Sequence, residues 1–160
     1  MALQASHLAA AQEWPGEMTG HPTEMEDRVA IHKLLMDYGA MLDRHDFDGF
    51  GKLFGADGHY KILEEQSAIG PDTGRMMREL YEAGDNYVEI PNFHMFYNEL
   101  IWFETPDKAR STSACMFLNT PDPATRKLNI QVAATYDDEI IREDGRWRFK
   151  RRTLAFPSNG

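Results

Sequence analysis

The sequence predicts an α+β fold in which helices near the N-terminus cover one face of a curved sheet. Apolar residues recur at helical spacing between positions 31 and 42, whereas the chain beyond Pro91 is rich in aromatic and β-branched residues. Turn sequences such as Thr105-Pro106-Asp107 and Glu143-Asp144-Gly145 divide that second part into strands. Helices ahead of a meander of strands are typical of folds whose helices pack on one face of an antiparallel sheet.

The first helix is expected to begin at Thr23 and to end near Asp43. Thr23-Glu24-Met25-Glu26 fits a capping box, and Pro22 discourages helix before it. Tyr38 belongs to the apolar face of this helix, and Asp43 lies close to its end. The apolar face is formed by Ile31, Leu34, Leu35, Tyr38, Met41 and Leu42.

A second helix, a strand and a third helix are expected next. Asp46 can cap a short helix whose buried side holds Phe47, Phe50, Leu53 and Phe54. Asp57-Gly58 is a turn signal before a strand over residues 59–63. Gly70-Pro71-Asp72 opens the third helix, which ends near Gly84.

Four strands are then expected over residues 92–103, 109–119, 128–142 and 146–156. Because side chains alternate between the two faces of a strand, His94 is expected to share its face with Phe96, Asn98 and Trp102.

The last strand carries a row of basic residues. Alternation places Arg151 beside Trp147 and Phe149, where it would pair with an acid such as Asp138 or Glu139 or contact an anionic group of a ligand. The opposite face would hold the other cations, Arg146, Arg148, Lys150 and Arg152.

Composition and charge limit the classes of function. The chain has 160 residues, enough for one domain with a real core. Its formal net charge of −9 argues against nucleic acid or an anionic membrane surface as the main partner. No window approaches the ~18 apolar residues that suggest a membrane-spanning helix. The single cysteine, Cys115, and an N-terminus unlike a secretory signal lead us to expect a cytoplasmic protein.

Three stretches carry a family resemblance: IHKLLMDYGAMLDRHDFDGFGKLF, FHMFYNELIWFE and YDDEIIREDGRWRFKRR. Together they resemble the SnoaL-like branch of the nuclear transport factor 2-like superfamily. The resemblance implies a domain over residues 23–157, preceded by an arm over residues 1–22. It also implies a cone-shaped, cystatin-like mixed sheet that encloses a pocket for a small apolar molecule, and a homodimer or higher homo-oligomer.

The resemblance also implies a site. Scytalone dehydratase, bile-acid dehydratase and dehydrochlorinase relatives have a helix carboxylate at the position of Asp43 and a strand histidine at that of His94. The two dehydratases add a tyrosine at the position of Tyr38, and the dehydrochlorinase has an arginine that Arg142 matches near the closing hairpin. These positions make His94, Asp43 and Tyr38 the expected catalytic residues. The expected substrate contacts are Tyr60, Phe96, Asn98, Trp102, Met116 and Arg142.

The three catalytic candidates fit proton abstraction next to a carbonyl. Histidine is a base near pH 7, a carboxylate on its other nitrogen fixes the tautomer, and a phenol can donate to the developing oxyanion. We therefore expect a cofactor-independent lyase or isomerase, such as a dehydratase, that acts on an apolar cyclic substrate. His45, Asp46 and His59 lack the spacing of a metal site, so no metal is expected.

A non-catalytic role is the alternative. The stretch LDRHDFDGFGKLFGADGHY also resembles the small subunit of ring-hydroxylating dioxygenases, which is structural. The strand RSTSACMFLN offers only Ser111, Thr112, Ser113 or Cys115 for the second polar catalytic residue that the dehydratases carry there. A ligand-binding module or a structural subunit is thus the second hypothesis.

Overall fold

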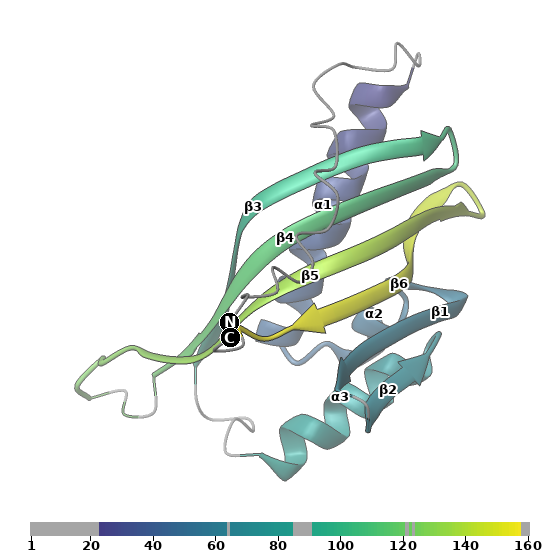
Figure 1. Cartoon of the computed structure of the whole chain (residues 1–160). Helices are drawn as coiled ribbons and strands as arrows, with labels where there is room; N and C mark the ends of the chain where they lie inside the picture. Colours follow the sequence, from purple (N-terminus) through teal and green to yellow (C-terminus); the bar gives the residue numbers. More distant parts are fainter. Residues whose placement is uncertain (1–22, 64, 85–90, 121, 123, 158–160) are drawn as a thin grey trace, which may run out of the picture.

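The computed structural model describes residues 23–63, 65–84, 91–120, 122 and 124–157. The predicted arm, residues 1–22, lies outside the described residues. Figure 1 shows the elements in chain order, which are α1 (Glu24–Asp43), α2 (Phe47–Gly51), β1 (Phe54–Leu63), β2 (Gln66–Ile69), α3 (Asp72–Ala83), β3 (Asn92–Thr105), β4 (Lys108–Asn119), β5 (Asn129–Glu143) and β6 (Arg146–Ala155). All the predicted helices and strands are present, and β2 is an addition that the sequence did not indicate. The predicted turn at Asp57-Gly58 is wrong, because β1 begins at Phe54 and runs through these two residues.

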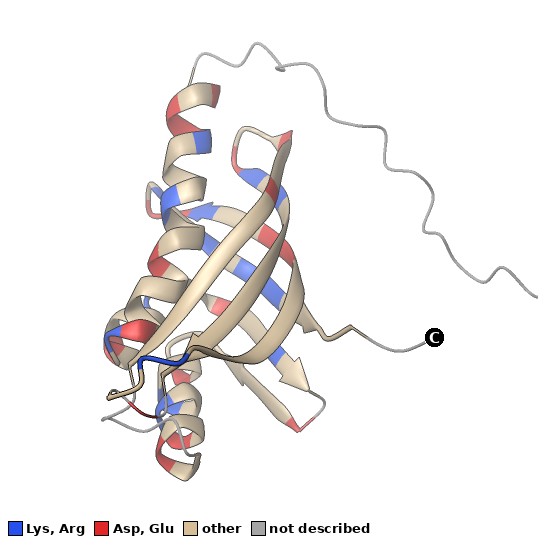
Figure 2. Cartoon of the chain, turned by 90° about the vertical axis from the view of Figure 1, so that its left-hand side faces the viewer, with Lys and Arg blue, Asp and Glu red and all other residues tan. Residues whose placement is uncertain are grey.

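The six strands form one sheet in the order β2-β1-β6-β5-β4-β3. Neighbouring strands are antiparallel except β1 and β6, which run parallel. Figure 2 shows the sheet curving around α1, which lies along its concave face, and α3 packs on α2 and β2. The prediction of an α+β fold with helices on one face of a curved mixed sheet is confirmed.

Of the side-chain caps predicted for α1 and α2, only the cap of α2 is present. The Thr23 hydroxyl donates to Asp27 Oδ2 at 2.8 Å and accepts no backbone N–H, so the predicted capping box is wrong. Asp46 caps α2 as predicted, because its carboxylate accepts the backbone N–H of Gly49 at 2.9 Å.

The core fills the space between the helices and the concave face of the sheet. The apolar face of α1 is buried as the helical spacing predicted, and the side chains of α2 and the inner face of β6 meet it. Gly39 allows α1 to approach β3, since a Cβ there would lie 2.8 Å from His94 Cβ and 2.9 Å from Phe96 Cε2.

A bulge in β3 changes which side chains face the core. Tyr97 pairs with Ala114 and Leu100 with Thr112, so β3 has one residue more than β4 between these pairs. Asn98 lies in the bulge with φ 53° and is exposed. Trp102 pairs with Arg110, outside the core. The expectation that Asn98 and Trp102 share the face of His94 is therefore wrong.

A second bulge, in β6, exchanges the faces that were expected for Arg151 and Arg152. Ile140 pairs with Phe149 and Glu139 with Arg151, so Lys150 is the extra residue. Arg152 consequently enters the core with 0% exposure, whereas Arg151 faces outward. The predicted pairing of Arg151 with Glu139 is confirmed at 2.6 Å, but on the outer face.

Candidate active site

Asp43, the last residue of α1, meets His94 of β3 at the concave face of the sheet. Asp43 Oδ1 lies 2.6 Å from His94 Nδ1, and Oδ2 accepts the backbone N–H of His94 at 3.0 Å. When Nδ1 donates its proton to Asp43, Nε2 of a neutral imidazole carries the lone pair. The two contacts therefore fix both the orientation and the tautomer of His94.

Aromatic rings hold the imidazole from the sides. The ring centroid of Phe117 lies 4.6 Å from that of His94, and the ring of Phe96 lies 6.5 Å away in a nearly parallel plane. Tyr38 approaches edge-on at 6.3 Å. With only 8% of its side chain exposed, His94 is positioned by packing as well as by its hydrogen bonds.

Three buried tyrosine hydroxyls converge next to this pair. Tyr38 Oη lies 2.5 Å from Tyr60 Oη and 3.4 Å from Tyr136 Oη. Burial raises the pKa of all three phenols and outweighs the nearby charge of Arg152, which acts in the opposite direction. The phenols are therefore neutral at pH 7 and can donate hydrogen bonds to a ligand oxygen.

A buried ion pair lies beneath the tyrosine rings. Arg152 Cζ is 4.1 Å from the ring centroid of Tyr38 and 3.9 Å from that of Tyr136. Arg152 Nη1 donates to Asp138 Oδ2 at 2.8 Å, and the Ser111 hydroxyl donates to the same oxygen at 2.8 Å. Burial raises the pKa of Asp138 to about 6, although Arg152 and Ser111 favour the charged form. The pair and the ring faces together stabilise a cation in the core.

His94, Tyr38, Tyr60 and Tyr136 line a hollow of about 270 Å³, a small volume for a ligand pocket. His94, the three tyrosines and the amide of Gln66 are its main hydrogen-bonding groups. The rest of the wall is formed mainly by apolar side chains, namely Leu42, Ile62, Met77, Leu80, Cys115, Phe117, Val132, Ala134, Leu154 and Phe156, together with Tyr81. An apolar wall with a few convergent polar groups is typical of a small-molecule site.

The structure brings together four of the nine predicted site residues, Asp43, His94, Tyr38 and Tyr60. Phe96 packs behind them, with its ring centroid 5.8 Å from that of Tyr38. Asn98 and Trp102 are displaced by the β3 bulge.

Met116 also fails to reach the hollow. It pairs with Met95 and Ala133, and its neighbours Cys115 and Phe117 line the hollow instead. Since successive side chains point to opposite faces, Met116 lies on the outer face, away from the hollow.

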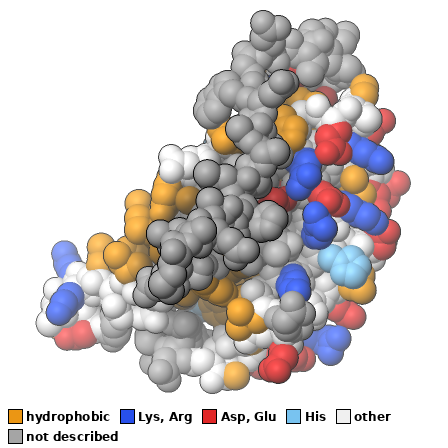
Figure 3. All heavy atoms as spheres, viewed as in Figure 1, with side chains coloured by type: hydrophobic (Ala, Val, Ile, Leu, Met, Phe, Trp, Pro, Cys, Tyr) orange, Lys and Arg blue, Asp and Glu red, His pale blue; other side chains and the backbone are white. Residues whose placement is uncertain are grey.

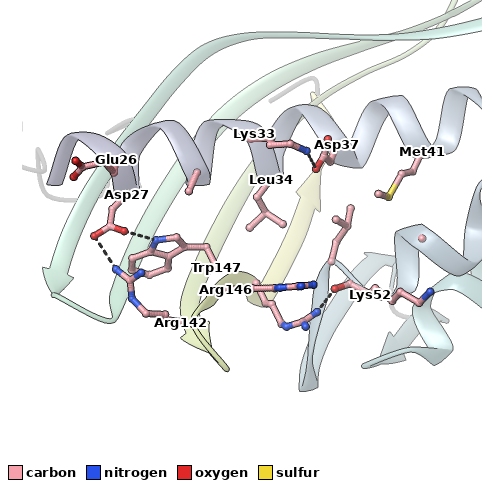
Figure 4. Close-up of a pocket in the computed structure, with 15 residues that line it drawn as sticks. Glu26, Asp27, Lys33, Leu34, Asp37, Met41, Lys52, Arg142, Arg146 and Trp147 are labelled. Carbon is pink, nitrogen blue, oxygen red and sulfur yellow. Dashed lines mark hydrogen bonds and ion pairs between the residues drawn. The ribbon is translucent and has the colours of Figure 1, made fainter. Parts of the chain in front are cut away.

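Arg142 lies near the opposite end of α1, as Figure 4 shows. Its guanidinium pairs with Asp27 at 2.7 Å and with Asp107 at 3.0 Å, and stacks on Trp147 at 4.5 Å. The Trp147 indole N–H donates to Asp27 as well, at 3.0 Å. Arg142, an expected substrate contact, therefore lines a separate groove and does not line the hollow beside His94.

Among the polar groups of the hollow and its support, sequence reasoning missed Gln66, Tyr136 and Arg152, and Gln66 lies on β2, which was not predicted. Tyr136 alternates with exposed Thr135 and Asp137 along β5, and this alternation was the available signal. Arg152 gave no such signal, because the bulge at Lys150 is not marked by a glycine or proline.

Within the described ranges, no three His, Cys, Asp or Glu side chains cluster closely enough to hold a metal ion.

None of the described helices combines the length and the apolar character needed to cross a membrane.

The SnoaL-like domain family matches residues 23–153. An uncharacterized Mycobacterium tuberculosis protein, Rv2910c, is 27% identical over 130 residues, which are 81% of this chain and 84% of that protein. A putative scytalone dehydratase from Novosphingobium aromaticivorans superposes with a TM-score of 0.70 at 23% identity, covering 85% of this chain and 87% of that one. ActVI-ORFA from Streptomyces coelicolor superposes with a TM-score of 0.74 at 16% identity, covering 85% and 98%. The structural likenesses show a shared fold, and the match over residues 23–153 shows that the chain belongs to the SnoaL-like family.

Proposed function

We propose that the protein is a cofactor-independent lyase or isomerase that removes a carbon-bound proton from a small, apolar cyclic ketone. His94 is the base, Asp43 positions it, and Tyr38 donates to the substrate oxygen. The observation that carries this proposal is the contact of Asp43 with His94 Nδ1 at 2.6 Å on the wall of an apolar hollow. The likeness to a putative scytalone dehydratase points to the same class of reaction.

The proton and the electrons can be followed through each step. Nε2 of His94 takes the proton next to the carbonyl, and the electrons of the C–H bond form an enolate whose oxygen accepts from Tyr38. In a dehydration, the enolate then expels the β-hydroxyl group, which leaves as water with the proton from the His94 imidazolium. In an isomerisation, the imidazolium returns the proton to another carbon. Asp43 stabilises the imidazolium in both cases.

Deuterium exchange tests the first step without knowledge of the natural substrate. We expect the protein to catalyse exchange of the α-protons of 2-tetralone in D2O, measured by NMR, and to dehydrate at least one β-hydroxy ketone in a panel that includes scytalone. His94→Ala should reduce the exchange rate by about 10²–10⁴-fold, the usual contribution of a general base. His59→Ala, an exposed histidine of β1, is the matched control and should leave the rate unchanged.

The same experiment separates the catalytic from the non-catalytic hypothesis. Binding of 2-tetralone in the hollow without exchange or dehydration of any ketone would favour a ligand-binding module or a structural subunit. Equal exchange by the wild type and by His94→Ala would remove His94 from the reaction.

We also propose a homodimer that forms through the outer face of the sheet. Figure 3 shows hydrophobic side chains gathered on this face over the first part of β3 and the adjoining ends of β4 and β5. Phe93, Met95 and Tyr97 are 49%, 53% and 41% exposed, and Ile130 is 60% exposed. Such a patch is typical of an interface. Light scattering should give twice the chain mass, and Met95→Glu should give the monomer; a monomeric wild type would contradict the proposal.

Two further predictions from the sequence are kept as proposals: that residues 23–157 form the functional domain, and that the protein acts in the cytoplasm. A chain that starts at Thr23 should keep the melting temperature and the exchange rate of the full chain. Cell fractionation tests the location, and recovery in a secreted or membrane fraction would contradict it.

A further inference from the structure

A second groove, of about 740 Å³, runs along another side of α1 and shares no residue with the hollow beside His94. Figure 4 shows its walls, which come from α1, α2 and the hairpin between β5 and β6. The proposed reaction makes no use of this groove.

The floor of the groove is apolar. Leu34 projects from the middle of α1, with Met41 on one side of it and Trp147 on the other. Leu53, two residues after α2, also lines the groove. The methylene stems of the cations at the rim add to this surface. A floor of this kind can hold a hydrocarbon chain or a ring.

The rim of the groove is cationic, although the chain as a whole has a net charge of −9. Five basic residues line it, against three acids. The basic residues are Lys33, Lys52, Arg142, Arg146 and Arg148, and the acids are Glu26, Asp27 and Asp37. The lining of the groove thus carries more basic than acidic side chains, which favours anions there.

Three of the five cations already have partners. Arg142 pairs with Asp27, Lys33 pairs with Asp37, and Arg148 bonds to the Lys52 carbonyl and to Glu143.

The remaining two cations line the groove from two elements, Arg146 from the start of β6 and Lys52 from the end of α2. Figure 4 shows both beside the groove, with the Lys52 side chain directed away from Arg146. Among the residues that the structure describes, no acid forms an ion pair with either side chain. The groove thus offers two uncompensated positive charges beside an apolar floor.

We propose that the groove binds a small amphipathic carboxylate, with its hydrocarbon body on the floor formed by Leu34, Met41 and Leu53 and its head at Arg146 and Lys52. The planar fork of an arginine matches the two oxygens of a carboxylate, and the lysine adds a second charge. The volume lies within the usual range for small-molecule sites. A free fatty or aryl acid of about ten carbons has this combination of properties.

Methionine methyl groups allow the site of binding to be read directly, because different methionines line different surfaces. Met41 lines the groove, Met77 lines the hollow beside His94, and Met95 lies exposed on the outer face of the sheet. The full chain, labelled with carbon-13 at the methionine methyls and assigned by Met→Leu variants, is titrated with decanoate, 1-decanol and decyltrimethylammonium below their micelle concentrations. Decanoate should shift the Met41 signal in a saturable way, with an affinity about tenfold above that of 1-decanol and higher still than that of the cation.

A double variant tests the head-group contact. Arg146→Ala with Lys52→Ala should lower the affinity for decanoate about tenfold, to that of 1-decanol. Arg151→Ala, which removes a cation on the outer face, should change nothing. Both changes are on the surface, so folding is preserved.

Several outcomes would overturn the proposal. These are an unshifted Met41 signal, equal affinities for decanoate and 1-decanol, or an unchanged affinity in the double variant. A shift of Met77 alone would place the ligand in the hollow, and a shift of Met95 alone would place it on the outer face; either result would reject the groove. Exchange of 2-tetralone is measured on the same samples, so the groove and the proposed reaction succeed or fail separately.

Discussion

The two ends of α1 are attached to the sheet by the same device, a carboxylate, with different chemical consequences. At the first end, Asp27 accepts from Arg142, Trp147 and Thr23. At the other end, Asp43 accepts twice from His94, once from the ring and once from the backbone. Both carboxylates connect residues that are far apart in the sequence.

The difference lies in what each partner can still do. Arg142 is a permanent cation whose pKa is raised further by its hydrogen bond to Asp27, so it cannot exchange a proton near neutral pH. His94 keeps a second ring nitrogen, and its ring lines the hollow. A carboxylate therefore marks a candidate active site when its partner is titratable and faces a cavity, and a structural link when it does not.

The largest expected effect is on turnover at the Asp43 end. Asp43→Asn should lower kcat for 2-tetralone exchange by about 10²-fold or more, with little change in KM, because the asparagine no longer favours the imidazolium. Asp27→Asn should leave kcat unchanged. Steady-state exchange rates measured between pH 5 and 9 check both variants.

The split between kcat and KM distinguishes a positioning role from simple loss of structure. An Asp43→Asn variant that keeps its KM still binds the ketone, so its fall in kcat reports the lost contact with His94. An Asp43→Asn variant with an unchanged kcat, or an Asp27→Asn variant with an equal loss of kcat, would remove the distinction between the two ends.

Two arginine–aspartate pairs extend the comparison to the stability of the folded chain. Arg152 and Arg142 each pair with an aspartate and stack on an aromatic ring, but Arg152 is fully buried, whereas the Arg142 side chain is 27% exposed. Arg152→Met should cost about 3–5 kcal/mol of unfolding free energy, because it leaves Asp138 buried without its partner. Arg142→Met should cost about 1 kcal/mol, since Asp27 keeps other donors.

Urea denaturation at pH 7 measures both changes. Arg151→Ala is the control on the same strand and should cost less than about 1 kcal/mol, as exposed ion pairs do. If Arg152→Met lowered the free energy of unfolding no more than Arg151→Ala does, burial would not explain the difference in stability between the two ion pairs.

Most of the fold could be predicted because it follows from periodicity and turn chemistry. The apolar face of α1, the cap at Asp46 and the β5–β6 hairpin are local signals, and the structure has all three. That the sheet is mixed came only from the family resemblance, and the parallel pairing of β1 with β6 was not predicted, since nothing local specifies a partner so far along the chain.

The site was harder to predict, because face assignments fail at bulges. One inserted residue moves every later side chain to the other face, which displaced Asn98 and Trp102 and exchanged the places of Arg151 and Arg152. Asp43 and His94 were expected from the family resemblance, and the face assignment of His94 is unaffected because it lies ahead of the bulge in β3. The position of Arg142 depends on tertiary contacts with Asp27 and Trp147, which no spacing indicates.

The smallest expected effect is the pH dependence of the Asp27 link. Burial opposes ionisation of Asp27, but hydrogen bonds from Arg142, Trp147 and Thr23 outweigh it and lower the pKa of the carboxyl in the folded chain. The unfolded chain then binds the proton more tightly, so Asp27 contributes stability above its unfolded pKa of ~3.9. That contribution is lost as the pH falls through the lower folded pKa.

Asp27→Asn should therefore destabilise the protein by about 1–2 kcal/mol at pH 7 and by progressively less below pH ~4, where the wild-type carboxyl takes up its proton. Asp138 acts in the opposite sense, because burial raises its pKa in the folded chain to about 6. Its ionisation therefore destabilises the folded chain. This effect is absent below pH ~4 and appears as the pH rises through 6. The stability difference between wild type and Asp27→Asn, followed by urea denaturation from pH 7 down to pH 3, isolates the first carboxyl because Asp138 is common to both chains. A difference that stays constant over this range would mean that Asp27 holds α1 through its shape and its neutral hydrogen bonds, and that the charge at this end of the helix contributes nothing.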